Sequence, residues 1–237
     1  MNIQKYYFNE LSSFVTQKLE LLKEVNLNLR GKKIDDQAMQ YLAFSLHNCQ
    51  NLLTLELYLS KNLITYDGAN NLGISIAQCS SLTSLTIDLW GCQINDQSIS
   101  NLISQISRCK LLTTLVLDLR DNQFLMKDLL GIENLIKLTN LTMNLSGNII
   151  YLKGIMRLGT YLEKCKNLKL LNLNLQKEIK QQQIEILSLA FQLSYLEKLS
   201  YFSFPFDFSK LDANKVKQQF YNLLMRKNTR LVKFQTN

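Results

Sequence analysis

The sequence predicts an α/β solenoid, in which a parallel sheet lines the concave side and one helix per repeat covers the convex side. Three observations predict this fold. Alternating leucines recur at a fixed interval, each copy is followed by apolar residues at helical spacing, and a short turn joins the two parts. The clearest copy begins Leu52, Leu55, Leu57, Leu59, and the same spacing returns from Leu82. Such a period directs the search for function to a surface built by repetition.

Eight copies cover most of the chain, and their successive starts are 30, 30, 30, 26, 30, 31 and 32 residues apart. The seventh copy is aromatic and the eighth is truncated. We therefore expect one domain over residues 19–237, a sheet of about seven or eight strands, and an N-terminal cap or tether over residues 1–18. The copies begin at Leu22, Leu52, Leu82, Leu112, Leu138, Leu168, Leu199 and Leu231.

The first part of each copy predicts a strand, because its apolar residues alternate with period two. If Leu57 and Leu59 are buried, Tyr58 faces outward. Outward side chains of neighbouring parallel strands, about 4.8 Å apart, should then align in columns. One such column contains Asn28, Tyr58, Asp88, Asp118, Asn144 and Asn174.

The second part predicts a helix, as in the run with Ile99, Leu102 and Ile106. Acidic residues such as Asp36 and Asp96 open these stretches, and we expect them to cap the first helical turn. In the turn between strand and helix, we expect an asparagine amide to pair with backbone groups of adjacent coils. These asparagines are Asn62, Asn122 and Asn148, and Cys92 takes the same place in its own repeat.

The phrase Leu-x-Leu-x-x-Asn-x-Ile/Phe, seen at residues 57–64 and 117–124 and with methionine first at 143–150, resembles the leucine-rich repeat. The helical half and the period near 30 resemble the ribonuclease-inhibitor-like class, over residues 19–237. The first leucine stands one residue earlier than in the common consensus, a variant similar to leucine-rich repeat proteins of ciliates. The resemblance implies a horseshoe. It leaves function open among inhibitors, GTPase activators, immune sensors and cytoskeletal scaffolds.

The five cysteines predict buried free thiols. Cys49, Cys79, Cys109 and Cys165 occupy the same place in four repeats, where cysteine acts as a small hydrophobe. There is no Cys-x-x-Cys pair and only one histidine, so we expect no metal site and no cofactor. Free thiols favour a reducing, cytoplasmic location. The sequence has no run of 18 or more apolar residues, so it predicts no membrane span.

The positive charge lies in the C-terminal half. Residues 1–120 hold 10 Lys/Arg and 10 Asp/Glu, whereas residues 121–237 hold 17 and 9, a net charge of +8. This field favours an acidic partner, which could be a protein surface, a nucleic acid or an anionic membrane. The alternative is a convex face kept soluble by lysines. The basic patch predicted at the last repeat comprises Lys210, Lys215, Lys217, Arg226, Lys227, Arg230 and Lys233.

The candidate partner-binding residues centre on Trp90, the only tryptophan. Trp90 should lie beside Arg120 of the next coil, and Trp, Tyr and Arg are the residue types most enriched at binding hot spots. The alternative is that Trp90 covers the adjacent coil. The full set predicted on the concave face comprises Tyr58, Asp88, Trp90, Asp118, Arg120, Asn144 and Asn174.

The function that we predict is non-catalytic protein–protein recognition, as an adaptor or scaffold of an intracellular assembly. The resemblance to ciliate proteins implies a cytoskeletal or ciliary assembly. The sequence contains none of the motifs that would point to an enzyme, such as a phosphate-binding glycine loop, Gly-x-Ser-x-Gly or His-Glu-x-x-His. Two alternatives are a GTPase-activating regulator and a nucleic-acid-binding protein. We also expect irregular backbone near residues 203–209, around Pro205, and docking of another chain at the C-terminal strand edge.

Overall fold

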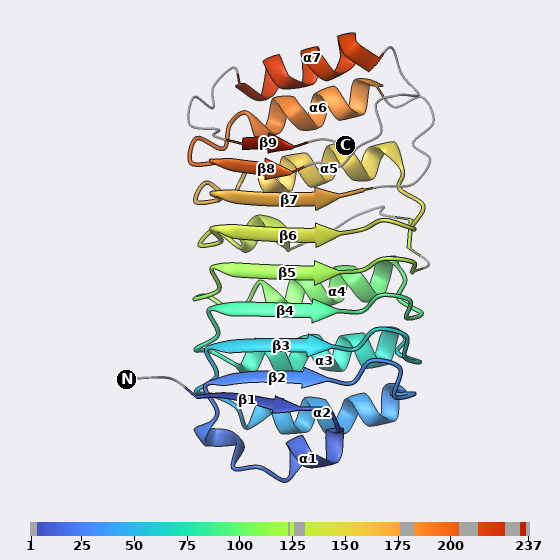
Figure 1. Ribbon diagram of the computed structural model, residues 1–237, viewed down its shortest axis with the longest axis vertical. Helices are drawn as coiled ribbons and strands as arrows, with labels where there is room; N and C mark the ends of the chain where they lie inside the picture. The colour runs from blue at the N-terminus through green and yellow to red at the C-terminus, as the bar shows by residue number, and fades with distance from the viewer. Residues whose placement is uncertain are drawn as a thin grey trace.

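The computed structural model describes residues 4–122, 124–125, 131–175, 183–203, 213–225 and 233–235. One sheet runs the length of the molecule, and its nine described strands follow the order of the chain, each parallel to the next (Figure 1). The strands are β1 Lys5–Phe8, β2 Glu24–Asn28, β3 Thr54–Tyr58, β4 Ser84–Asp88, β5 Thr114–Asp118, β6 Asn140–Asn144, β7 Leu170–Asn174, β8 Tyr201–Ser203 and β9 Lys233–Gln235.

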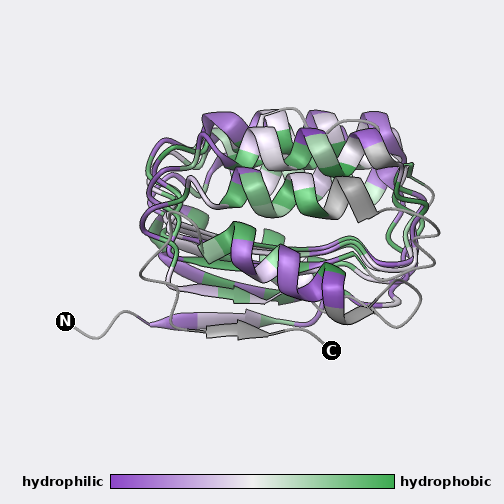
Figure 2. Cartoon of the chain, turned by 90° about the horizontal axis from the view of Figure 1, so that it is seen from above, coloured by the Kyte–Doolittle hydropathy of each residue, from purple (hydrophilic) through white to green (hydrophobic). Residues whose placement is uncertain are grey.

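The helices form a second layer that covers one face of the sheet (Figure 2). In the repeat that starts at Leu112, the helical element of the described residues is a short 3-10 helix, η2 Ile132–Asn134. This repeat is the one with a spacing of 26 residues. The remaining helical elements are α1 Leu11–Val15, η1 Leu19–Leu21, α2 Asp36–His47, α3 Tyr66–Gln78, α4 Asp96–Ile106, α5 Leu152–Leu162, α6 Gln183–Leu193 and α7 Ala213–Met225.

The strand register confirms the predicted solenoid. Leu57 of β3 pairs with Ile87 of β4, and Ile87 pairs with Leu117 of β5. All three side chains are buried, because neighbouring coils share one apolar interior. The sheet has more strands than the seven or eight expected, since the cap region contributes β1, which pairs with β2. Phe14 of α1 is also fully buried, so this region packs on the same core.

Asparagines hold the turns together, as predicted. The Asn62 amide donates to the carbonyls of Leu29, 2.9 Å away, and Leu59, 2.7 Å away, and its Oδ1 accepts from the N–H of Ile34 at 3.0 Å. Asn122 and Asn148 bridge adjacent coils in the same way. At Cys92 only a weak contact remains, with Sγ 3.4 Å from the carbonyl oxygen of Leu59.

The expected helix caps were misplaced by one residue. Asp35 and Asn95 are the N-caps of α2 and α4, and their side chains accept from the N–H groups of Ala38 and Ser98. The next residues instead tie one repeat to the following one. Asp36 accepts from the Thr65 N–H at 2.9 Å and from its hydroxyl, and Asp96 accepts from the Leu125 N–H at 2.9 Å. A side chain inside the first turn points away from that turn's own N–H groups, and so it can reach the following repeat.

The cysteines are free and buried. The thiols of Cys79, Cys109 and Cys165 point at carbonyl oxygens of the preceding repeat, 3.3 to 3.5 Å away. Burial raises the pKa of Cys49, Cys79 and Cys165 to about 12 and that of Cys109 to about 11. Across the described residues there is no group of side chains that could hold a metal ion.

Among the helices of the described ranges, none has the length and apolar character needed to span a membrane. Most of the region expected to be irregular, residues 203–209, lies outside the described residues, and so does Pro205. The last strand of the sheet, β9, pairs with β8 through Lys233, Phe234 and Gln235.

Candidate functional site

The outward side chains at the carboxyl ends of the strands form the predicted column. Tyr58 pairs with Asp88, Asp88 with Asp118, Asp118 with Asn144, and Asn144 with Asn174. With strands about 4.8 Å apart, Asn174 lies roughly 14 Å from Asp88, three strands away. The column is therefore continuous, but only its first part can contact Trp90.

Acidic and amide residues of this column form a turn at the carboxyl end of each of three strands. Asp88 Oδ1 accepts from the N–H of Trp90 at 3.1 Å, and Asp118 Oδ1 accepts from the N–H of Arg120 at 3.2 Å. Asn144 accepts from Ser146 at 3.3 Å in the same way. A side-chain oxygen that accepts from the N–H two residues on is an Asx turn, which ends an extended segment. These three predicted site residues therefore have a structural role.

The second carboxylate oxygens of the two aspartates bind arginines. Asp88 is only 5% exposed, and its Oδ2 accepts from Arg30 Nε and Nη2 at 3.0 and 2.8 Å. Asp118 binds Arg120 of its own turn through both oxygens, with Nη2 to Oδ2 at 2.6 Å. The hydrogen bond with Asp118 raises the pKa of Arg120. The guanidinium carbon of Arg30 also lies 4.4 Å from the centroid of the Tyr58 ring.

Trp90 is held on three sides. Its indole Nε1–H donates to Asp121 Oδ2 at 2.8 Å. The ammonium nitrogen of Lys61 lies 4.4 Å from the indole centroid, and the guanidinium carbon of Arg120 lies 4.9 Å away. Lys61 comes from the preceding repeat, and Arg120 and Asp121 come from the next one. We call Lys61, Trp90, Arg120 and Asp121 the Trp90 cluster; the indole stays partly exposed within it.

Two members of the Trp90 cluster occupy left-handed backbone positions that other repeats give to glycine. Lys61 has a φ of 55° and Asp121 a φ of 49°, at the turn position taken elsewhere by Gly31, Gly91 and Gly147. A left-handed residue with a side chain costs roughly 1–2 kcal/mol. Such strain is concentrated at sites where the side chain is needed. Here both strained side chains contact the same indole.

Glycine at position 147 makes room for this arrangement. A Cβ on Gly147 would lie 1.9 Å from Asp121 Oδ1 and 3.0 Å from the Asp121 backbone nitrogen. Because Asp121 holds the indole nitrogen, any side chain at position 147 would push the acceptor of Trp90 out of place. Contacts therefore run through four consecutive turns, from Gly147 to Asp121, from Asp121 to Trp90, and from Trp90 to Lys61.

The charges around Trp90 balance. Three cations, Arg30, Lys61 and Arg120, face three carboxylates, at Asp88, Asp118 and Asp121. On the neighbouring strands, Lys5 Nζ binds Glu56 at 2.6 Å, and this contact raises the pKa of Lys5. Burial raises the pKa of Tyr58. The surface is a fixed pattern of paired charges and aromatic rings and has no excess of either sign.

Sequence reasoning placed Trp90 beside Arg120, and the structure brings them together. It missed Arg30, Lys61 and Asp121. The 30-residue period was the available signal for the last two, since it places them at the turn positions of Gly31 and Gly91. Asn144 and Asn174 lie in the column but beyond the Trp90 cluster.

The predicted basic patch is only partly described. Lys215 and Lys217 are exposed on α7, and the backbone of Lys233 lies in β9. The other four residues lie outside the described ranges, namely Lys210, Arg226, Lys227 and Arg230.

Comparison with known proteins identifies likeness in fold alone. No protein-family model matches the chain, and no curated protein matches it. Among solved structures, the chain is similar to an internalin from Listeria monocytogenes, with a TM-score of 0.47 and 17% sequence identity. The match covers 84% of this chain and 52% of the internalin, so the chain spans about half the length of that structure.

Proposed function

We propose that this protein recognises other proteins through the face of its sheet that the helices leave uncovered, which is the predicted concave face. The Trp90 cluster would be the centre of this binding surface. The observation that carries this proposal is the strained pair Lys61 and Asp121, which position one partly exposed indole. An indole fixed before binding loses little conformational freedom when a partner covers it. Tryptophan and arginine are also among the residue types most enriched at binding hot spots.

The rest of the surface supports recognition of a defined polar partner. The ion pairs of Arg30 with Asp88 and Arg120 with Asp118 fix both guanidinium groups, and the side chain of Arg30 remains 51% exposed. A partner that presents hydrogen-bond acceptors in matching positions would bind without reorganisation of these groups. A mismatched partner would leave buried charges unpaired, which costs several kcal/mol. The pattern thus favours selectivity.

We assign the basic C-terminal half a separate role, that of attracting an acidic partner. The positive excess lies in residues 121–237, whereas the three cations and three carboxylates around Trp90 balance. Long-range attraction raises association rates and weakens with salt. On this view, salt slows association, while changes at Trp90 speed dissociation.

The finer classification belongs to the same proposal. A period near 30 and α-helices of 11 to 13 residues favour the ribonuclease-inhibitor-like class and an adaptor or scaffold role. Five buried free thiols favour an intracellular location. The alternatives, GTPase activation and nucleic-acid binding, predict accelerated GTP hydrolysis and a steep salt dependence of binding to polynucleotides.

The test is affinity capture with wild-type protein and with the Trp90→Ala, Arg120→Glu double variant, followed by titration of the recovered partner. We expect the double variant to bind at least tenfold more weakly. The matched control is Tyr151→Ala, which removes an aromatic side chain of 52% exposure outside the cluster. Equal recovery by wild type and the double variant would refute the proposal.

A further inference from the structure

Helix α2 is covered unequally on its two sides. On one side lies α3, a helix of 13 residues, and on the other lies α1, with only 5 residues (Figure 1). At 1.5 Å per residue, α1 is about 7.5 Å long, whereas the 12 residues of α2 extend over about 18 Å. Much of the α2 side that faces away from α3 therefore has no α-helix against it among the described residues, and beyond α1 it meets only Leu19 of the short 3-10 helix η1.

The composition of this side changes where the cover is lost. In α4, Asn101 donates to the Tyr66 hydroxyl of α3 at 2.8 Å, so this helical position faces the preceding repeat. Two repeats earlier the position is Tyr41, and in α3 it is Asn71. Phe44 stands where α3 has Ile74 and α4 has Ser104. Tyr41 and Phe44 thus give α2 two large aromatic side chains where the next two α-helices have asparagine, isoleucine or serine.

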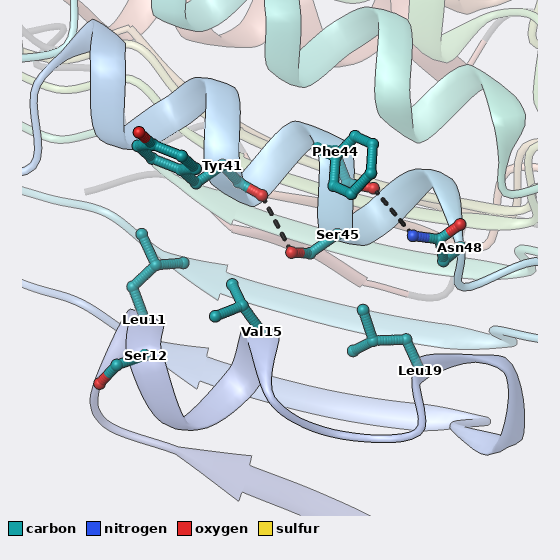
Figure 3. Close-up of a pocket in the computed structure, with 8 residues that line it drawn as sticks. All are labelled: Leu11, Ser12, Val15, Leu19, Tyr41, Phe44, Ser45 and Asn48. Carbon is teal, nitrogen blue, oxygen red and sulfur yellow. Dashed lines mark hydrogen bonds between the residues drawn. The ribbon is translucent and has the colours of Figure 1, made fainter.

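The result is an apolar hollow of about 430 Å³ between α1 and α2 (Figure 3). Phe44 and Tyr41 on its rim are 73% and 62% exposed. Two of its polar side chains already have partners, since the Ser45 hydroxyl donates to the Tyr41 carbonyl at 2.9 Å and the Asn48 amide donates to that of Phe44. The hollow is lined by Leu11, Ser12, Val15, Leu19, Tyr41, Phe44, Ser45 and Asn48.

We propose that this hollow is the interface with a second copy of the same chain, related by a two-fold axis. An interface of this kind must complement itself, so one patch has to supply both a projection and a recess. Here the projecting ring of Phe44 borders the recess between α1 and α2 (Figure 3). The Phe44 ring of each copy would enter the hollow of the other.

Charge favours a second copy at this end of the solenoid. The residues that line the hollow carry no charge, and residues 1–120 together carry no net charge, so two such surfaces approach without strong repulsion, whereas residues 121–237 carry +8. The elements around the hollow lie at the opposite end of the molecule from α6 and α7 (Figure 1). Contact between the two hollows therefore keeps the two basic halves at the far ends of the dimer. The outer face of each sheet stays free.

The first test is sedimentation equilibrium of the purified chain between about 1 and 100 μM. We expect wild type to dimerise and Phe44→Glu to dimerise at least tenfold more weakly, with circular dichroism unchanged because Phe44 is exposed. The control is Ile149→Glu, a residue of 61% exposure outside the hollow, which should dimerise like wild type. A wild-type chain that stays monomeric throughout this range would overturn the proposal.

The second test locates the interface. The native thiols are all buried, so a cysteine placed at exposed Asn48 would be the reactive one. We expect Asn48→Cys, treated with a short bis-maleimide, to give a covalent dimer in high yield, and Ile149→Cys to give almost none. Similar yields from the two variants, or a dimer that Phe44→Glu leaves intact, would show that the copies meet elsewhere.

Discussion

The carboxylate of Asp118 serves two groups with its two oxygens. It accepts from the Arg120 backbone N–H and also binds the guanidinium group of the same residue. The first contact closes a turn and the second sets the position of an exposed cation beside Trp90. An acidic residue in this column therefore contributes to stability and to the candidate binding surface, and the two contributions can be separated by substitution.

Asp118→Asn is expected to retain the turn, because an amide oxygen accepts from the backbone as a carboxylate does, while the ion pair with Arg120 is lost. We expect a loss of unfolding free energy of about 1 kcal/mol or less, as for an ion pair that solvent still reaches, since the Arg120 side chain is 37% exposed. Asp118→Ala removes both contacts and should cost about 1–2 kcal/mol. Urea unfolding of both variants measures the difference, and equal losses would contradict the turn assignment.

Asp121 combines a strained backbone with a useful side chain. Asp121→Gly should relieve the left-handed strain while removing the acceptor of the indole N–H, so unfolding free energy should stay within about 1 kcal/mol of wild type. Asp121→Ala loses the hydrogen bond without relief and should be the less stable variant by about 1 kcal/mol.

Intrinsic fluorescence reports the loss of the indole hydrogen bond directly, since Trp90 is the only tryptophan. In both Asp121 variants we expect a shifted emission maximum and easier quenching by acrylamide. Lys33→Gly provides a control, because it relieves a left-handed residue that no contact links to Trp90. Unchanged emission in the Asp121 variants would mean that this carboxylate does not fix the indole.

Between repeats, the turns are joined by the asparagine contacts, and one step of this ladder is weak. Asn62, Asn122 and Asn148 each donate to two or more carbonyls, whereas Cys92 offers only its thiol. A strong donor at position 92 would meet the carbonyls of Leu59 and Leu89 by the 30-residue equivalence. The weak step lies directly beside Gly91 and the Trp90 turn.

Cys92→Asn should therefore stabilise the solenoid by about 1 kcal/mol, because it adds hydrogen bonds to buried carbonyls. The reverse change, Asn122→Cys, should destabilise it by about 1–3 kcal/mol, since buried backbone groups lose their partner. Thermal unfolding of the two variants gives opposite shifts if this account holds. A destabilised Cys92→Asn would show that the turn at position 92 cannot accept an amide.

Across the whole molecule, the fold was predictable because period and alternation are properties of the chain itself. A recurring leucine phrase requires equivalent residues to stack, which sets strand order and register together. The contacts of the candidate site were less predictable. Arg30 reaches Asp88 two strands away, and Lys61 and Asp121 reach Trp90 from neighbouring turns. Such contacts depend on the conformations that long side chains adopt over the sheet, and the repeat spacing in the sequence does not specify those conformations.

The stacked thiols predict how the stability of the whole solenoid depends on pH. Burial raises the pKa of Cys49, Cys79 and Cys165 to about 12, from an ordinary value near 9. Between these values the unfolded chain holds fewer protons than the folded chain, so stability falls as pH rises. The stabilising contribution is complete below about pH 9 and is lost towards pH 12, by about 1.4 kcal/mol per pH unit for each thiol.

Urea unfolding at pH 8, 9, 10 and 10.5 measures this decline, and comparison with Cys79→Ala isolates the contribution of one thiol from that of all other groups. Cys79→Ala should be less stable at pH 8, because a buried side chain is truncated. Above pH 9 its stability should fall less steeply than that of wild type, by about 1.4 kcal/mol per unit. Parallel declines would mean that the Cys79 thiol ionises as readily in the folded solenoid as in the unfolded chain, and the interior would then not be closed to water at that repeat.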